Sequence, residues 1–193
     1  MDFLKHINFV GDDGVNRGMI NDFVRNQFYE NIFVDTVKDQ HCMDIGFGTG
    51  LLSVLALKHG AKTIVAYEID QHRYELGRYI IDRLGYSNKI QLINQKFTRD
   101  DFQQYPNVTT VFSETVNGNL WQEGLFNSLP RSPGVNFLPS NYFLELYACK
   151  IPRVFAQGLV QFRTSQGFTP GVDIDDKFVQ LINQLGFPAH QEE

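Results

Sequence analysis

Three alternating glycines constrain this chain more than any other feature of its sequence. They follow a strand-like segment that runs up to Asp44, and they lie at Gly46, Gly48 and Gly50. Directly after them, Leu51 opens a run of helical apolar spacing that extends to His59. This order is typical of a strand, a tight glycine turn and the N-terminus of a helix. Because glycine lacks a side chain, such a turn also lets the backbone pass close to a ligand.

A second strand-like segment ends in an acidic residue. The segment Thr63–Tyr67 is mostly apolar, and Glu68 and Ile69 follow it, about twenty residues after the glycine turn. A carboxylate at this place in a β–α–β unit can accept hydrogen bonds from both hydroxyls of a ribose. The pattern therefore predicts a nucleoside-binding site in which Glu68 holds the ribose, with Ile69 beside it.

The spacing of the glycines and the acid before them indicate which nucleoside. The turn reads Gly-x-Gly-x-Gly, whereas a dinucleotide fingerprint has its third glycine one residue later. This spacing disfavours a Rossmann-type oxidoreductase. Asp44 precedes the turn and suits a cationic or zwitterionic ligand better than an anionic one. S-adenosylmethionine carries a sulfonium, an amine and a ribose, so we expect a methyltransferase that uses it, with Leu51 at the start of the cofactor-binding helix.

Composition narrows the class of protein further. The chain has 193 residues, 42% of them hydrophobic and 20% charged, which is enough for one packed domain or a domain plus part of another. The formal net charge of −5 makes nucleic acid an unexpected partner but allows basic substrates. The two cysteines lack metal-ligand spacing, so no metal is expected. Without a membrane-spanning or signal-peptide pattern, we expect a soluble cytoplasmic protein and leave a nuclear location open.

Beyond the glycine turn, strands and helices alternate along the chain. Helical apolar spacing begins at Asn16 and continues to about Val37. After residue 50 we expect a helix at Leu51–His59, a strand at Thr63–Tyr67, a helix at Gln71–Leu84, and strands at Lys89–Asn94 and Asn107–Phe112. This alternation predicts an α/β fold with a doubly wound, mostly parallel, Rossmann-like sheet of the seven-stranded methyltransferase type.

The character of the sequence changes near residue 140. Tyr142–Ile151 and Val154–Phe162 read as consecutive strands without a helix between them. We therefore expect an N-terminal helical cap at 1–38, an S-adenosylmethionine-binding domain at 39–140, and the start of a β-barrel-like substrate region at 141–193. Because this β-rich region is unfinished at residue 193, we expect either a piece of a longer protein or a reduced relative.

Two acids follow the strand at Asn107–Phe112. Glu114 comes directly after Ser113, and Glu123 lies nine residues further on, at the sheet edge where doubly wound folds bind ligands. Two ionised carboxylates side by side repel each other, so such a pair is favoured when a cation occupies the space between them. A guanidinium is planar, permanently charged and suited to bidentate pairing, so it fits this demand.

With these motifs in place, the chain resembles the protein arginine methyltransferases over roughly residues 16–165. The segment from Ser113-Glu114 to Glu123-Gly124 resembles their double-glutamate loop, and the Glu-Gly pair is most similar to the monomethylating branch. The segment Met19–Asn26 is similar to the family's N-terminal helix. The resemblance implies that Met19 packs near the transferred methyl group and that Arg25 meets the cofactor's carboxylate. It also implies an arginine-containing protein substrate and allows a homodimer.

The sequence departs from the family pattern in three places. The family has an acid near the adenine amine, whereas this chain has a charged segment at Lys96–Asp101, which we interpret as a solvated turn. Phe97 and Thr98 are the cofactor contacts that we predict there. The family's Thr-His-Trp loop does not occur in this chain, whose one tryptophan is Trp121. The dimerisation arm is not recognisable.

These observations support a mechanism and leave two alternatives open. In the mechanism, Glu114 and Glu123 hold the substrate guanidinium by charge-assisted hydrogen bonds and aim one terminal nitrogen at the methyl group. The first alternative is a methyltransferase of the same fold that acts on another small-molecule, protein or nucleic-acid acceptor. Against the common amino-methylating nucleic-acid type, no Asn/Asp-Pro-Pro-Tyr/Phe motif follows the fourth strand. The second alternative is a catalytically silent partner module, which the missing Thr-His-Trp loop favours.

Overall fold

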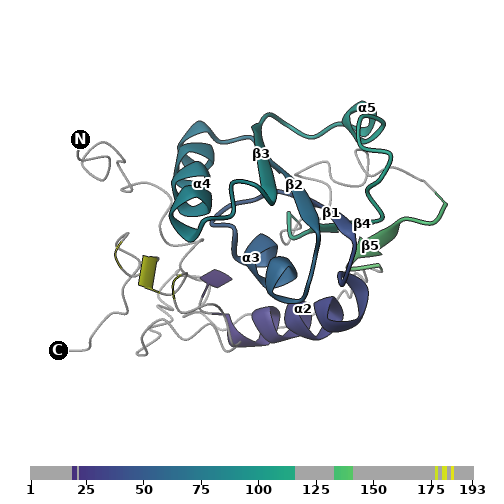
Figure 1. Ribbon diagram of the computed structural model, residues 1–193, viewed down its shortest axis with the longest axis horizontal. Helices are drawn as coiled ribbons and strands as arrows, with labels where there is room; N and C mark the ends of the chain where they lie inside the picture. Colours follow the sequence, from purple (N-terminus) through teal and green to yellow (C-terminus); the bar gives the residue numbers. More distant parts are fainter. Residues whose placement is uncertain are drawn as a thin grey trace, which may run out of the picture.

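The computed structural model of the chain describes residues 19–20, 22–115 and 133–140, together with helical residues 177, 180, 181 and 184 (Figure 1). The predicted β-rich region from residue 141 and the acid Glu123 lie outside the described residues. The division of the chain into three regions therefore stays a prediction. The described residues contain the whole glycine turn, the helix before it and the sheet around it.

Within the described residues, five parallel strands form one sheet in the order β3-β2-β1-β4-β5. Their bounds are β1 His41–Ile45, β2 Thr63–Glu68, β3 Ile90–Asn94, β4 Thr110–Ser113 and β5 Asn136–Leu138. The chain moves outward from β1 to β2 and β3, and then returns to the other side of β1 with β4. This reversal defines a topological switch point, where ligands bind at the carboxyl ends of the strands. The fold class predicted from the sequence is confirmed.

Local end signals determine where the helices of this domain begin and end. The helices are α2 Phe23–Thr36, α3 Leu51–Lys58, α4 Gln71–Leu84 and α5 Arg99–Phe102. Asp70 caps α4 by accepting a hydrogen bond from the backbone N–H of Arg73 at 2.9 Å, and Gly85 ends the helix with φ +75°. The predicted bounds of α4 are confirmed, because both of its ends are encoded by adjacent residues.

The helix predicted from Asn16 differs at its start. Met19 and Ile20 are helical, but α2 itself begins at Phe23. Asp22 is extended and accepts a hydrogen bond from the backbone N–H of Arg25 at 3.0 Å, as an N-cap does. An aspartate inside an apolar-periodic run competes with the helix for its own backbone, and here it starts a new helix.

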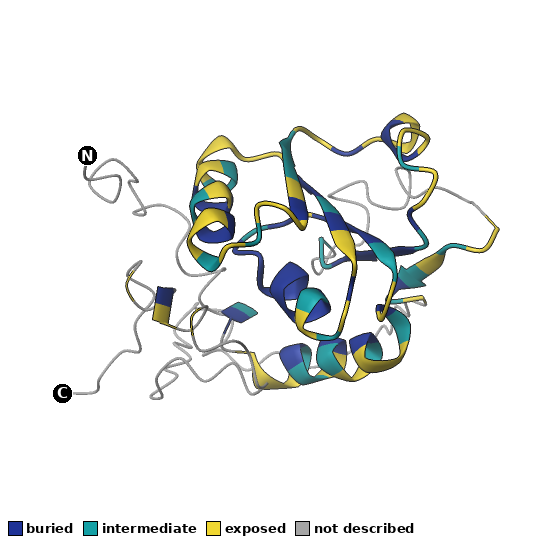
Figure 2. Cartoon of the chain, in the orientation of Figure 1, coloured by how far each residue is buried: buried dark blue, intermediate teal, exposed yellow. Residues whose placement is uncertain are grey.

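The two faces of the sheet bury different side chains because strand residues alternate in direction. The face that carries Cys42, Ile64 and Phe112 packs against α2, α3 and α4 in the larger core cluster. The opposite face carries Met43 and Val111 and packs against residues around α5. Figure 2 shows the central strands β1 and β4 and helix α3 mostly buried, with exposed outer faces on α2 and α4. Packed side chains therefore cover both faces of the sheet and hold the carboxyl ends of its strands in place.

Among the described residues, no helix combines the length and apolar character that crossing a bilayer requires. The part of the chain that the structure describes also contains no cluster of three or more His, Cys, Asp or Glu residues able to hold a metal ion.

Candidate functional site

The glycine turn leaves the carboxyl end of β1 in a conformation that only glycine adopts easily. Gly46, Gly48 and Gly50 have φ values of +90°, +55° and +80°. The backbone N–H groups of Gly46 and Phe47 both donate to the Tyr67 carbonyl at 2.9 Å, which ties the turn to the end of β2. A methyl group on Gly46 would collide with the Thr115 side chain, and one on Gly50 with the Phe47 ring. Side chains of the protein therefore fill the space on one side of the turn, and the two hydrogen bonds to Tyr67 fix its position.

Glu68 braces this turn and is available to a ligand. One carboxylate oxygen accepts from the Gly48 N–H at 2.8 Å, and the other accepts from the Asp70 N–H at 2.9 Å. The side chain is buried, and burial raises its pKa. A carboxylate has four acceptor positions, and the backbone N–H groups of Gly48, Asp70 and Ile69 are its donors here, so acceptor capacity remains for a ribose hydroxyl. The sequence predicted the ribose role but not the bracing role, which depends on backbone donors from two loops.

Asp44 lies fully buried at the end of β1 with one oxygen unsatisfied. Its Oδ2 accepts a hydrogen bond from the Ser53 hydroxyl at 2.6 Å, whereas its Oδ1 has no hydrogen-bond partner. Burial raises the pKa of Asp44 to about 7; the Ser53 hydrogen bond and the charge of Arg25 lower it, and the nearby Glu68 raises it. Buried polar atoms normally have partners, so a free carboxylate oxygen here marks a position for a cationic donor.

Arg25 extends from α2 toward the same edge of the sheet. One terminal nitrogen, Nη2, donates to Glu114 Oε2 at 3.0 Å, and the other, Nη1, donates to Asn26 Oδ1 at 3.0 Å. Its Nε is buried and has no hydrogen-bond partner. Among the described residues, Arg25 Nε and Asp44 Oδ1 are the buried side-chain atoms in this condition. One is a donor and the other an acceptor, so together they fit the carboxylate and the amine of a zwitterionic ligand.

Two residues that the sequence analysis did not select hold Arg25 in position. The Tyr29 ring lies under the guanidinium, 5.5 Å from its central carbon, and the Tyr29 hydroxyl donates to the Ser113 carbonyl at 3.2 Å. Asn26 is fully buried and donates to the Ile20 carbonyl at 2.8 Å. The spacing of Arg25 and Tyr29, four residues apart on one helix face, was a readable signal. Their contacts with Ser113 and Glu114 were not readable, because the segments lie far apart in the chain.

The remaining predicted residues fall into different environments. Glu114 lies just past β4 with its side chain 27% exposed, paired with Arg25. Met19 is half-buried, and its carbonyl oxygen lies 3.5 Å from Arg25 Nη1. Leu51 is buried in the main core cluster, and Ile69 is exposed beside Glu68. The second acid of the predicted pair, Glu123, lies outside the described residues, so the pair stays a prediction.

Near the predicted adenine position, the structure shows a capped helix rather than a solvated turn. Phe97 is buried against the Tyr67 ring, with ring centres 5.1 Å apart. Both the hydroxyl and the N–H of Thr98 donate to Asp101, at 2.7 and 2.8 Å, and Asp101 is buried. This capping box starts α5. The prediction that Lys96, Arg99, Asp100 and Asp101 form a solvated turn was right about the exposure of Lys96, Arg99 and Asp100. It was wrong about Asp101, which is buried, and about the turn, because Arg99–Phe102 is helical; the Thr-x-x-Asp spacing was the signal for this cap.

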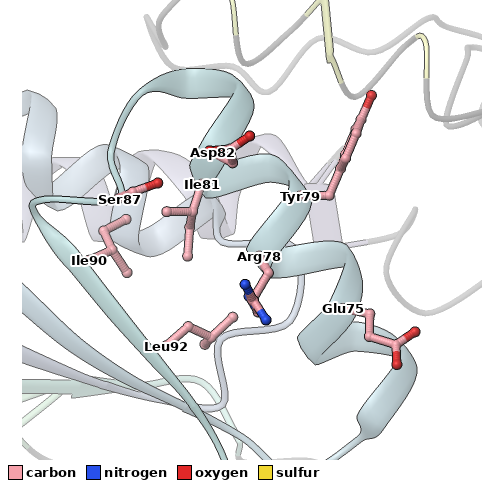
Figure 3. Close-up of a pocket in the computed structure, with 8 residues that line it drawn as sticks. All are labelled: Glu75, Arg78, Tyr79, Ile81, Asp82, Ser87, Ile90 and Leu92. Carbon is pink, nitrogen blue, oxygen red and sulfur yellow. The ribbon is translucent and has the colours of Figure 1, made fainter. Parts of the chain in front are cut away.

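A separate surface pocket of 460 Å³ lies between α4 and β3 (Figure 3). Its apolar lining comes from Ile81, Ile90 and Leu92, and Glu75 and Arg78 are among the charged residues around it. Figure 3 shows these side chains on α4 and β3. None of the sequence-predicted site residues lines this pocket, and neither unsatisfied buried atom belongs to it. The candidate site is therefore the edge formed by the ends of β1, β2 and β4 with α2.

Comparisons with known proteins find similar sequences among methyltransferases. The family model described as ribosomal protein L11 methyltransferase (PrmA) matches residues 27–112. Protein arginine N-methyltransferase 1 of Saccharomyces cerevisiae is 31% identical over 119 residues, which are 60% of this chain and 34% of that protein. Human protein arginine N-methyltransferase 9 is 32% identical over 115 residues, 58% of this chain and 14% of that protein. The chain thus spans about a third or less of these relatives' length.

Solved structures show the same fold. A crystal structure of PRMT6 with SAH superimposes with a TM-score of 0.53 at 21% identity, covering 65% of this chain and 45% of that chain. Protein arginine methyltransferase 10 of Arabidopsis thaliana gives a TM-score of 0.52 at 21% identity, covering 65% of this chain and 35% of that chain. At this identity, the likeness supports the fold alone.

The sheet order and the match to the PrmA family model over residues 27–112 show the Rossmann-like fold that methyltransferases of this kind have. In sequence, the chain is similar to the protein arginine N-methyltransferases over about 60% of its length, which agrees with the resemblance seen in its motifs. Protein arginine N-methyltransferases 1, 7 and 9 all match the chain. The similarity of this chain to the monomethylating branch therefore stays a prediction.

Proposed function

We propose that this chain contributes the cofactor site of an S-adenosylmethionine-dependent methyltransferase that acts on a guanidinium nitrogen of protein arginine. The observation that carries the proposal is the pair of unsatisfied buried atoms, Asp44 Oδ1 and Arg25 Nε, beside the glycine turn. One can accept from the cofactor's amine, and the other can donate to its carboxylate. Glu68 has acceptor positions for the ribose hydroxyls at the end of the neighbouring strand.

The cofactor supplies a methyl group that a sulfonium has already activated, so the protein needs mainly to bind and to orient. S-adenosylhomocysteine, the product of methyl transfer, is named in the PRMT6 structure that shares this fold. In our proposal Asp44 holds the amine, Arg25 the carboxylate and Glu68 the ribose. Gly46, Gly48 and Gly50 let the backbone approach the ligand closely.

On the substrate side, Glu114 and Glu123 would hold the guanidinium of a protein arginine. Charge-assisted hydrogen bonds to the carboxylates would keep positive charge on two nitrogens and aim the third at the methyl group. The proton leaves after the nitrogen carries the methyl, so a strong general base is not required. The position of Glu114 just past the end of β4, paired with Arg25, supports this proposal.

The experiment that tests this function is transfer of labelled methyl from S-adenosylmethionine to an arginine- and glycine-rich peptide, followed by amino-acid analysis. We expect labelled Nη-methylarginine. Glu123→Gln should lower turnover by on the order of a hundredfold or more while leaving S-adenosylhomocysteine affinity nearly unchanged. Glu75→Gln, an exposed acid on α4, is the matched control and should keep full activity.

Other outcomes would change the proposal in defined ways. Label on another amino acid or on a small molecule would keep the fold and replace the acceptor. A folded chain that binds S-adenosylhomocysteine but transfers no label would favour the silent partner module.

A further inference from the structure

The pocket between α4 and β3 has no part in the proposed function. Its volume of 460 Å³ lies within the range of small-molecule sites. Ile81 and Ile90 are buried and Leu92 is half-buried, so these three side chains form an apolar floor. β3 is the outer strand of the described sheet on this side, and no further strand among the described residues lies beside it. A ligand with an apolar body can therefore pack against this floor.

Arg78 adds a positive charge above the apolar floor. Figure 3 shows its guanidinium directed from α4 toward Leu92 on β3. The central carbon of this guanidinium lies 6.0 Å from the centre of the Tyr74 ring. Within the described part of the chain it forms no hydrogen bond and no ion pair, although Glu75 and Asp82 are three and four residues away on the same helix. A guanidinium is suited to bind a carboxylate through two parallel hydrogen bonds, so the pocket offers a position for one.

The two acids that line the pocket do not make it a site for a cation. Glu75 Oε1 accepts a hydrogen bond from Gln71 Nε2 at 2.8 Å, and Figure 3 shows the Glu75 carboxylate directed away from β3. Asp82 is exposed, as Glu75 is, so water and salt screen both charges. Arg78 is the charged side chain of the lining that is directed toward the apolar floor. The pocket therefore favours an anion with an apolar body.

Leu92 connects this pocket to the glycine turn across α4. Gly77 lies inside that helix, and a Cβ on it would come within 2.7 Å of Phe47 Cε1 and 2.8 Å of Leu92 Cδ2. Glycine is unfavourable inside a helix, and its presence here is explained because these two side chains fill the space that a Cβ would need. Phe47 itself lies between Gly46 and Gly48 and is buried. A side chain of the pocket and the ring of the glycine turn therefore pack against the same point of α4.

We propose that the pocket between α4 and β3 binds a small carboxylate with an apolar body, that Arg78 holds its carboxylate, and that this ligand strengthens cofactor binding. The ligand covers the half-buried Leu92 side chain and holds it against Gly77, beside the Phe47 ring. The glycine turn then loses less conformational freedom when the cofactor binds, which gives positive coupling between the two ligands. The carboxylate site stands on the pocket alone, whereas the coupling rests on the proposed function.

The first test uses 4-phenylbutyrate as the probe and 4-phenylbutyramide as its uncharged match. Binding is followed by NMR of the chain labelled at its isoleucine and leucine methyl groups. We expect shifts at Ile81, Ile90 and Leu92, a dissociation constant of about 1 mM for a ligand of this size, and about fivefold weaker binding of the amide. Arg78→Gln should bind the carboxylate as weakly as the amide. Arg83→Gln removes an exposed arginine of α4 outside the pocket and should keep the original affinity.

The second test measures the affinity of S-adenosylhomocysteine by calorimetry, with and without saturating 4-phenylbutyrate. We expect about fivefold tighter binding when the pocket is occupied, at the lower end of typical couplings between two sites. Leu92→Val shortens the side chain that reaches Gly77, so this variant should still bind the probe but show a smaller coupling. Ile90→Val, a matched change on the same strand and in the same pocket, should keep the coupling.

An absence of methyl shifts, or equal affinity for the carboxylate and the amide, would overturn the inference. Unchanged affinity for S-adenosylhomocysteine in the presence of bound probe would overturn it as well. Failure of S-adenosylhomocysteine to bind in any state would instead overturn the proposed function and the coupling with it. The methyl shifts are measured without the nucleoside, so they decide on the carboxylate site in either case.

Discussion

Asp44 is the residue whose ionisation has the clearest consequences, because it is fully buried and its pKa is raised to about 7. In the unfolded chain the same carboxyl has a pKa of 3.8. The folded state therefore holds more protons than the unfolded state between these values, and stability falls as pH rises through this window. We expect the urea midpoint of the ligand-free chain to decrease from pH 5 to pH 7, and this decrease to be smaller in Asp44→Asn. If the urea midpoint of Asp44→Asn fell with pH as steeply as that of the unaltered chain, the raised pKa could not belong to Asp44.

Cofactor binding should have the opposite pH dependence. The amine of S-adenosylhomocysteine needs an ionised Asp44, so binding at pH 6 must first release the proton. We predict that affinity falls as pH decreases below about 7 and that binding below this pH releases a proton. Calorimetry in buffers of different ionisation enthalpy measures that release directly. Asp44→Asn should bind weakly at all pH values and release no proton.

Ser53 tunes this ionisation through its 2.6 Å hydrogen bond to Asp44. A hydrogen bond to a charged group stabilises the ionised form, and its loss should raise the pKa of Asp44 further. We predict that Ser53→Ala moves the pH midpoint of S-adenosylhomocysteine binding upward by about one unit. Ser87→Ala, on the loop before β3, should leave the midpoint where it is. A downward shift for Ser53→Ala would show that the hydroxyl favours the protonated acid instead.

At the scale of elements, α2 is fastened to the end of β4 by two side chains one turn apart. Arg25 reaches Glu114, and Tyr29 reaches the carbonyl of Ser113. Ser113 continues the connection by donating its hydroxyl to the Ile45 carbonyl of β1 at 2.8 Å. The helix that precedes the sheet in sequence thus closes over the switch point, where the glycine turn and Glu114 meet.

The Tyr29 anchor can be removed without removing the ring under Arg25. Tyr29→Phe leaves a buried carbonyl without its donor, so we expect a loss of about 1–2 kcal/mol in the free energy of unfolding. Tyr74→Phe, on the first turn of α4, is the matched change and should cost less than about 0.5 kcal/mol. Urea denaturation measures the free energy of unfolding of both variants. Equal effects would mean that the Tyr29 hydroxyl does not fasten α2 to β4.

At the scale of the whole molecule, one residue far along the chain returns to the main core. Leu181 is 5% exposed and belongs to the cluster that contains Ile20 and Tyr29. Leu181→Ala should therefore cost about 2–5 kcal/mol of unfolding free energy, the usual range for a buried leucine. Gln184→Ala, exposed on the same stretch, should be nearly neutral. A neutral Leu181→Ala would show that this part of the chain does not stabilise the domain.

The sequence predicted most reliably those features that neighbouring residues encode. The helix Gln71–Leu84 was predicted with correct bounds because Asp70 and Gly85 mark its ends. The strand–turn–helix around the glycines was likewise readable. The start of α2 was not, because the cap at Asp22 lies inside an apolar-periodic run.

The internal contacts of the site could not be predicted. Arg25 and Glu114 were each selected from the sequence, but for different ligands. Their 3.0 Å contact joins residues 89 positions apart, and no local pattern reports such a pair. The same holds for Tyr29 with Ser113. Single residues of the site could therefore be read from the chain, whereas their pairing required the fold.

The central claim is that the unsatisfied atoms of Asp44 and Arg25 bind the two ends of the cofactor's amino acid. A crystal structure of the chain with S-adenosylhomocysteine tests it most directly. We predict the amine at Asp44 Oδ1, the carboxylate at Arg25 Nε, and the ribose hydroxyls on Glu68. A nucleoside bound elsewhere, such as the pocket between α4 and β3, with Asp44 Oδ1 and Arg25 Nε still without partners, would contradict the account.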